Sequence, residues 1–282
     1  MGAISSLFGY ILNALYNLFN NYGIAIIIFS ILLRIILIPI TIKQQKTMKK
    51  TTKMQQEMNS IREKYKNDPE KLNQETIELY KRENMSPFSG CLSAILQLVI
   101  ILAVFWLVSQ PLTYMKKVQN SELFNEYKQK IEEQTDTKST YKEIAIIDKV
   151  ESDYQEILNN LNDENVENRE ELENRKNQLE ELRINMEFLG LDLSKVPTQS
   201  LNDWKVYVIP VLYVITSFIS IRLTTKTQNS KNDNEVKSAE AESMEQMNKS
   251  MSYMMPIMSI SIAAIAPLGL ALYWLVSNIL MI

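Results

Sequence analysis

Residues 23–42 read Gly-Ile-Ala-Ile-Ile-Ile-Phe-Ser-Ile-Leu-Leu-Arg-Ile-Ile-Leu-Ile-Pro-Ile-Thr-Ile, an apolar run with one cation, Arg34, near its middle. A run of about 20 residues is long enough to cross a bilayer as a helix. A charged side chain at mid-membrane costs about 2.5–3.5 kcal/mol on insertion scales. No Asp or Glu that could pair with Arg34 lies in any other apolar segment. A water-filled cavity inside the membrane domain is the simplest way to keep Arg34 charged.

The rest of the chain alternates between apolar and polar stretches. Of its 282 residues 46% are hydrophobic and the formal net charge is −3, values that average over a segregated sequence. Lys, Glu, Asn and Gln dominate between the apolar runs, which also occur near residues 91–112, 206–224, 251–266 and 268–282. This pattern predicts an all-α polytopic membrane protein with five transmembrane helices and one large polar insert.

The composition also excludes several function classes. Cys91 is the sole cysteine and there is no histidine, so an intramolecular disulfide and a thiolate or imidazole metal site are ruled out. The sequence contains no Gly-rich phosphate loop and no Walker-type lysine. We therefore expect no metal, no cofactor and no ATP-driven step, and we do not expect an enzyme.

Basic residues predict the orientation in the membrane. Five lysines in residues 43–53, directly after the first span, mark the cytoplasmic side. Residues 43–90 hold 11 Lys and Arg against 7 acids, whereas residues 116–205 hold 13 against 21. Arg222 and Lys226 agree with this orientation, while Lys116 and Lys117 oppose it mildly. With the N-terminus outside and the C-terminus in the cytoplasm, the expected segments are an external interfacial helix 1–22, a first span 23–42, a cytoplasmic helical hairpin 43–90, a second span 91–115, an external acidic helical insert 116–205, a third span 206–224, a cytoplasmic linker 225–250, and fourth and fifth spans 251–266 and 267–282.

Residues 3–20 carry apolar side chains at helical spacing beside Ser and Asn, which predicts a helix lying on the outer interface. The alternative is an extension of the first span, but the sequence Asn-Asn-Tyr-Gly at 20–23 breaks the run. The expected apolar face consists of Leu7, Ile11, Leu12, Leu15, Leu18 and Phe19.

Residues 43–86 are expected to form two antiparallel helices of about 20 residues each. Asp68 can cap the second helix, and Pro69 can occupy its first position, after a turn at Asn67. The alternative is an unremarkable basic loop. The apolar seams that favour the hairpin are Met54, Met58, Ile61 and Tyr65 on the first arm and Leu72, Thr76, Leu79 and Tyr80 on the second.

The acidic stretch 154–186 favours helix and predicts helical hairpin material outside the cell. This insert either binds something or is only a solvated coiled coil. Its loosely spaced leucines are Leu158, Leu161, Leu172, Leu179 and Leu182.

Several strings together resemble the YidC family of membrane protein insertases in its short, five-span form. The resemblance covers residues 21–112 and 188–282, and it depends on the order and spacing of the strings. They are Asn-Tyr-Gly-Ile-Ala at 21–25, Leu-Leu-Arg-Ile-Ile-Leu-Ile-Pro at 32–39, Glu-Lys-Tyr-Lys-Asn-Asp-Pro-Glu-Lys-Leu at 63–72, Pro-Phe-Ser-Gly-Cys-Leu at 87–92 with Gln97, Asp-Leu-Ser at 192–194, Met-Pro-Ile-Met at 255–258, and Pro-Leu-Gly-Leu-Ala-Leu-Tyr-Trp-Leu-Val-Ser-Asn at 267–278.

The resemblance implies an insertase of the bacterial plasma membrane, with a hydrophilic groove open to the cytoplasm and to lipid. Nascent membrane proteins and the lipid bilayer would be its partners, with the ribosome and the Sec translocon as further candidates and no sequence-specific binding of nucleic acid. A substrate's polar tail would enter the groove while its apolar helix slides into lipid without ATP. The residues implied are Arg34, Gln97, Tyr273, Trp274, Ser277 and Asn278 in the groove, and Tyr65, Asp68, Pro69 and Tyr80 in a hairpin that recruits substrates.

Four of the groove residues also have a plainer interpretation. Arg34 could snorkel to the interface or bond backbone carbonyls as a structural pin. Gln97 could make an interhelical hydrogen bond. Tyr273 and Trp274 could belong to an interfacial aromatic belt, although they lie about 5 residues into the span.

The chain departs from the family pattern at several places. Ser93 and Val99 stand where prolines often occur, the insert at 116–187 is longer than the usual external loop, and no basic tail follows Asn278, which puts tail-mediated ribosome binding in doubt. Two other functions also remain open. One is a small-anion carrier that uses Arg34, and the other is a membrane-anchored scaffold that acts through the external insert.

Overall fold

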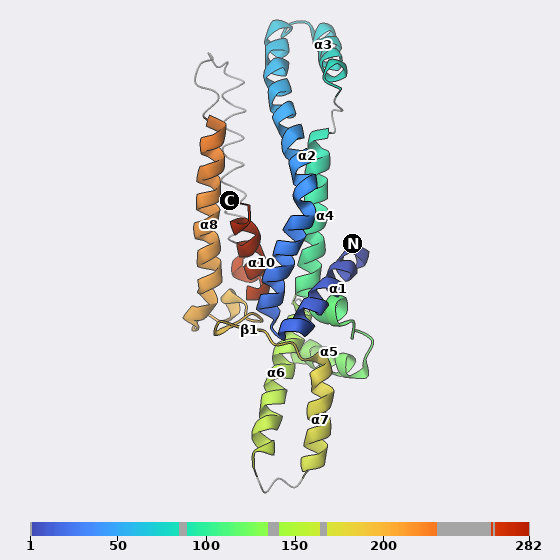
Figure 1. Ribbon diagram of the computed structural model, residues 1–282, viewed down its shortest axis with the longest axis vertical. Helices are drawn as coiled ribbons and strands as arrows, with labels where there is room; N and C mark the ends of the chain where they lie inside the picture. The colour runs from blue at the N-terminus through green and yellow to red at the C-terminus, as the bar shows by residue number, and fades with distance from the viewer. Residues whose placement is uncertain are drawn as a thin grey trace. The chain divides into compact units, whose positions relative to one another are not determined.

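The computed structural model is almost entirely helical, and it describes residues 2–84, 89–134, 141–163, 168–229, 261 and 263–281 (Figure 1). The expected all-α class is confirmed, apart from one short two-stranded hairpin. The described residues form two compact units. The first contains those of Met1–Leu32, Leu102–Asp233 and Ser250–Ile282, and the second contains those of Leu33–Ile101 and is called the hairpin unit below.

Helix α1 (Gly2–Phe19) ends where the sequence predicted a break, because Asn20 adopts a left-handed φ of 47° and α2 (Tyr22–Lys64) begins two residues later. The side of α1 that packs against the protein consists of Ser5, Gly9, Leu12 and Tyr16. Of the six residues in the expected apolar face, only Leu12 is buried. Small side chains decide the packed face, because the Ser5 hydroxyl donates to the carbonyl of Ala103 at 3.0 Å and Gly9 lies directly against the backbone of Tyr114.

Helix α2 runs for 43 residues without a break, so the first arm of the expected hairpin is not a separate helix. At residue 42, where the first span was expected to end, the sequence changes from apolar to polar but the helix continues. Residues 43–64 contain no Gly or Pro that would end it. Pro39 lies inside the helix. Among the described residues, Tyr22–Thr47 is the helical stretch long and apolar enough to cross a membrane, and its mean hydropathy is 2.7.

The second arm of the hairpin is α3 (Pro69–Arg82), which at 14 residues is shorter than expected. Its start confirms the prediction from the sequence, because the Asp68 carboxylate accepts a hydrogen bond from the Lys71 amide and Pro69 occupies the first turn. The two arms are held together by a core of Met54, Met58 and Leu79, with Ile61 and Tyr80 packed against it.

Helix α4 (Ser89–Ser109) ends ahead of Pro111, which has no amide hydrogen to continue the helical ladder. The chain continues as a single π-helical stretch, η1 (Leu112–Lys116), which Lys117 closes with a φ of 60°. The expected second span, 91–115, is therefore an α-helix followed by a π-turn. This π-turn is the surface on which α1 packs.

The acidic insert contains α5 (Glu122–Gln134), α6 (Lys142–Leu161) and α7 (Arg169–Leu182), which pack on one another. The sequence did not predict the antiparallel strands β1 (Glu187–Phe188) and β2 (Leu191–Asp192) that follow. Leu179 and Leu182 are buried, whereas Leu158, Leu161 and Leu172 are partly exposed. The buried face that makes α6 a packed helix consists of Glu143, Ile144, Ile146, Ile147, Val150, Tyr154 and Ile157.

Two 3₁₀ helices, η2 (Pro197–Gln199) and η3 (Trp204–Tyr207), lead into α8 (Val208–Asn229). Helix α8 packs against α10 (Leu268–Ile279). Most of the expected fourth span 251–266 and most of the linker 225–250 lie outside the described residues, which include 261 and 263–266 of that span. The described chain also contains three shorter apolar helices, Ile95–Ser109, Trp204–Ser220 and Leu268–Ile279.

Candidate functional site

Arg34 lies on α2 among large apolar side chains, and it is half-buried. Leu33 beside it is 7% exposed, whereas Ile35 and Ile36 are more than half exposed. The guanidinium group is therefore carried by a helix whose outer surface is apolar. A cation in such apolar surroundings is favourable only with polar or anionic partners, which a guanidinium group binds through its N–H donors.

Gln97 lies on α4 and is exposed, with exposed apolar neighbours at Ile95, Leu96 and Leu98. An amide on such a surface can donate and accept hydrogen bonds with a polar segment that passes along the helix. Arg34 and Gln97 both belong to the hairpin unit.

The polar stripe of α10 meets α8. The side-chain amide of Asn278 donates to the hydroxyls of Thr216 and Ser217 at 3.1 and 3.0 Å. The ring centroids of Trp274 and Tyr213 lie 6.5 Å apart. The other two predicted residues on this helix are Tyr273, which is buried, and Ser277, which is half-buried. Asn278 thus has a structural role in joining the two helices.

The four α10 residues belong to the first unit, and Arg34 and Gln97 belong to the hairpin unit. A single groove lined by all six side chains stays a prediction.

The four residues predicted in the hairpin all support its turn and core. The Tyr65 hydroxyl donates to the Glu75 carboxylate at 3.1 Å, which joins the two arms near the turn. Tyr80 packs against the hairpin core described above, and Asp68 with Pro69 begins α3. The hairpin therefore has its own small core, a hydrogen bond between its arms and a capped second helix. Ion pairs of Lys50 with Glu83 and of Arg82 with Glu57 connect its arms on the outside.

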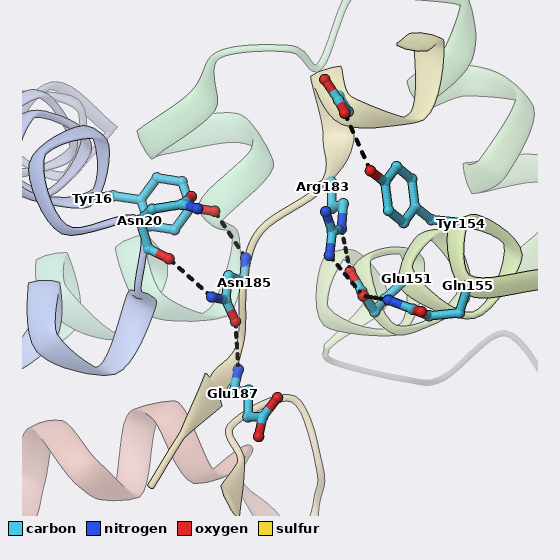
Figure 2. Close-up of polar contacts among 9 residues, drawn as sticks. Tyr16, Asn20, Glu151, Tyr154, Gln155, Arg183, Asn185 and Glu187 are labelled. Atoms are coloured by element: carbon cyan, nitrogen blue, oxygen red, sulfur yellow. Dashed lines mark hydrogen bonds and ion pairs between the residues drawn. The ribbon is translucent and has the colours of Figure 1, made fainter. Parts of the chain in front are cut away.

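Asn185 was not predicted as a structural residue from the sequence. It forms hydrogen bonds with backbone groups at the break between α1 and α2 (Figure 2). Its side-chain amide donates to the carbonyl of Asn20 at 2.9 Å, and its own carbonyl accepts from the amide of Tyr22 at 3.0 Å. Its backbone amide donates to the hydroxyl of Tyr16 at 2.8 Å, and its side-chain oxygen accepts from the amide of Glu187 at 3.1 Å. Helix ends leave such groups without partners, so one residue closes this junction.

Arg183, two residues before Asn185, fixes the insert to the same junction (Figure 2). Its Nε and Nη2 donate to the two carboxylate oxygens of Glu151 at 2.6 and 3.0 Å. The guanidinium carbon lies 3.9 Å from the centroid of the Tyr154 ring, and the Tyr154 hydroxyl donates to Glu180 at 3.2 Å. No local sequence pattern marks these contacts, because the partners lie on α6 and α7.

Glu143 is a second buried anchor of the insert, with only 7% of its surface exposed. Its carboxylate accepts hydrogen bonds from the amide and the hydroxyl of Thr113 at 3.0 and 2.5 Å. Burial raises the pKa of this carboxyl above its usual range, although the hydrogen bonds from Thr113 act in the opposite direction. The start of α6 is thereby fixed to the π-turn that ends α4.

An open cleft of about 560 Å³ lies within the insert, between α5, α6 and α7. Its floor includes Tyr127, Ile157 and Leu172, and its rim carries charges of both signs. Two of these charges, Arg175 and Lys130, are already paired with Glu126. None of the predicted site residues lines this cleft. The described part of the chain also holds no group of three His, Cys, Asp or Glu placed to bind a metal ion.

Comparison with known proteins gives a match to the family model described as 60Kd inner membrane protein over residues 14–282. A similar protein from Fusobacterium nucleatum is 45% identical over 96 residues, which is 34% of this chain and 47% of that protein. One from Caldanaerobacter subterraneus is 39% identical over 105 residues, covering 37% and 51%. One from Syntrophus aciditrophicus is 42% identical over 113 residues, covering 40% and 20%. All three are named membrane protein insertase YidC, and the alignments span about half of these relatives or less.

Proposed function

Since the chain belongs to the 60Kd inner membrane protein family, we propose that it is a membrane protein insertase and chaperone of the bacterial plasma membrane. The observation that carries the proposal is the family match over residues 14–282, which includes the Arg34-bearing helix. In this proposal the chain has five spans, with its N-terminus outside and its C-terminus in the cytoplasm. It acts without ATP.

Arg34 provides a binding site for the polar tail of a substrate inside the apolar layer of the membrane. A tail that carries a carboxylate or backbone carbonyls can exchange water for the guanidinium donors of Arg34, which lowers the barrier to its passage. Gln97 supplies an amide for the same purpose. Tyr273, Trp274, Ser277 and Asn278 complete a polar groove open to the cytoplasm and to lipid.

The substrate's apolar helix moves on the outer surface of the spans. The exposed isoleucines of α2 around Arg34 and the exposed Val211, Ile215 and Phe218 of α8 offer an apolar path into lipid. Partitioning of that helix supplies the driving force, at about 0.8 kcal/mol for each buried CH₂ group.

The helical hairpin recruits the substrate on the cytoplasmic side. Its five lysines at residues 43–53 and its rigid turn at Asp68 support this role. Nascent membrane proteins are the proposed cargo, and the ribosome and the Sec translocon are proposed partners at this hairpin.

The test is insertion into liposomes that contain the purified protein. A single-span substrate with a short acidic N-terminal tail is added, and protease protection of the tail is measured for wild type, Arg34→Ala and Arg34→Lys. Empty liposomes give the background. We expect several-fold less protection with Arg34→Ala and near-wild-type protection with Arg34→Lys, because the lysine keeps the charge.

Equal protection by all three variants, above background, would keep the insertase proposal and remove Arg34 from its mechanism. Protection no better than that of empty liposomes would contradict autonomous insertion. A substrate with an uncharged tail serves as the matched control, since it should depend less on the charge at position 34.

A further inference from the structure

Three large apolar side chains stand out from the protein just before α8. Leu189 is 86% exposed, Leu201 is 69% exposed and Trp204 is 72% exposed. Tyr207 is 38% exposed and lies one 3₁₀ turn after Trp204, on the same face of η3. These four residues are called the interfacial patch below. Trp204 and Tyr207 stand at the start of the apolar helix Trp204–Ser220, and Leu189 and Leu201 precede it in the chain.

The backbone at Leu189 is unfavourable for a leucine. Leu189 and Gly190 adopt φ values of 53° and 75° in the turn between β1 and β2. Such turns favour Asn followed by Gly, because a branched side chain crowds the backbone at positive φ. An exposed leucine at this position does not contribute to the packing of the fold.

The turn is nevertheless held in place. Phe188 packs so closely against Gly23 that a side chain there would overlap its ring. The amide of Leu193 donates to the carbonyl of Met186 at 2.9 Å, and β2 packs against η3. Val206 in η3 is 1% exposed, so it fixes the helix while Trp204 faces outward. The β1–β2 turn and η3, which carry three of the four patch residues, are therefore packed against the rest of the protein.

The place of the patch along the chain identifies what covers it. Helix α8 begins at Val208, directly after Tyr207, and its first turns expose Val211 and Leu212. In the proposed function α8 crosses the membrane from this end, so the patch must lie where the outer leaflet meets water. Trp and Tyr concentrate at that depth, since their rings are apolar and their polar atoms stay hydrated. Lys205 is exposed beside Trp204, in a position suited to lipid phosphates.

We propose that Leu189, Leu201, Trp204 and Tyr207 insert into the boundary between headgroups and acyl chains of the outer leaflet, and so anchor the β1–β2 turn and η3 to lipid. The proposal rests on the proposed function, because it requires α8 to be embedded in the membrane. It adds an interfacial, lipid-binding role for residues that the proposed function does not use.

The test uses the full chain in liposomes, in a Cys91→Ser background, with an environment-sensitive fluorophore on one introduced cysteine. The positions are Leu189→Cys and Trp204→Cys in the patch, Ile215→Cys on the exposed face of α8, and Glu156→Cys on α6. Lipids with a nitroxide near the headgroup or deep in the acyl chain act as quenchers. We expect at least twofold stronger shallow than deep quenching at residues 189 and 204, deep quenching at 215, and none at 156.

The outcomes separate the two proposals. Quenching at residue 215 without quenching at 189 and 204 would overturn the anchor and leave the proposed function intact. Absence of quenching at residue 215 would contradict the membrane placement of α8, and with it the proposed function. If the fluorophores at residues 189 and 204 emit as in an apolar environment but lipid nitroxides do not quench them, a protein surface covers the patch. That result would also overturn the lipid anchor.

A Leu189→Asn variant distinguishes lipid anchoring from a role in folding. Asn adopts positive φ more readily than Leu, so we expect the Tm in detergent to equal or exceed that of wild type. In liposomes the same variant should reduce the shallow quenching of a fluorophore at residue 204 by at least twofold. A Tm several degrees below wild type would show that Leu189 serves the fold, and would overturn the proposal.

Discussion

Arg183, the residue that follows α7, binds α6 through its guanidinium group two residues before the junction at Asn185 (Figure 2). The pairing with Glu151 is bidentate, and the stacking on Tyr154 uses the flat face of the same group. Lysine can form neither geometry, because its ammonium is a point donor without a planar face.

We expect Arg183→Lys to lower the local stability of α6 and α7 by about 1 kcal/mol, a modest value because both ion-pair partners are about one-third exposed. Hydrogen exchange of the insert in detergent measures this directly. Arg169→Lys is the matched control, since Arg169 donates to the backbone carbonyls of Leu161 and Asp163 and pairs with no carboxylate among the described residues. Equal effects of the two substitutions would contradict a special role for Arg183.

Glu143 is expected to make the stability of the insert depend on pH. Because burial raises its folded-state pKa, the folded protein holds this proton more strongly than the unfolded chain does. The contribution of Glu143 to stability is therefore lost as the pH rises from the ordinary range of Glu, about 4.3, through the raised pKa.

We expect the Tm of wild type to fall relative to that of Glu143→Gln as the pH rises from 5 to 8, because glutamine stays neutral throughout. Thermal unfolding in detergent at several pH values gives the difference. The exposed Glu170→Gln is the control, and its Tm should follow that of wild type. A difference between wild type and Glu143→Gln that does not change with pH would contradict the prediction.

At the scale of elements, the position of α1 depends on the absence of a side chain at residue 9. A Cβ there would overlap the backbone carbonyl of Tyr114 in the π-turn η1. Backbone cannot give way as the end of a flexible side chain can, so α1 must shift if this glycine is replaced.

We expect Gly9→Ala to destabilise the packing of α1 by about 1–3 kcal/mol. Gly2→Ala is the matched control, because a Cβ at that position lies 4.0 Å from the ring of Tyr114, which is ordinary contact. Hydrogen exchange of α1, or protease cleavage near Asn20, reports the change. Unchanged protection in Gly9→Ala would show that α1 does not pack on η1.

Elements with local determinants could be predicted from the sequence. The cap at Asp68, the break at Asn20 and the hairpin core of Met54, Met58 and Leu79 all follow from nearby residues or from one helical period. The packed face of α1 could not be predicted, because a partner surface selects the small residues on it. Asn185 escaped prediction for a similar reason, since its partner Asn20 lies 165 residues away.

At the scale of the whole chain, the two units are covalently joined through α2 and α4. The boundary crosses α2 between Leu32 and Leu33, and it crosses α4 between Ile101 and Leu102. Arg34 lies two residues beyond the last residue of the first unit, and Gln97 lies close to the corresponding point in α4. The sequence predicted both residues from their polarity in apolar runs. The sequence did not predict that they flank a structural boundary, because that boundary arises from long-range packing.

In the proposed function, the uninterrupted helix from Arg34 to Lys64 would act as a lever. At 1.5 Å per residue it is about 45 Å long, so a load on the hairpin at its far end exerts a large moment near the charged residue. Pro39 removes one backbone hydrogen bond about one turn away from Arg34, which makes that point the natural pivot. In the proposed function, a small swing of the basic arm would rotate or tilt the guanidinium group of Arg34. Capture of a substrate at the hairpin and reorientation of the cation would then occur in one movement.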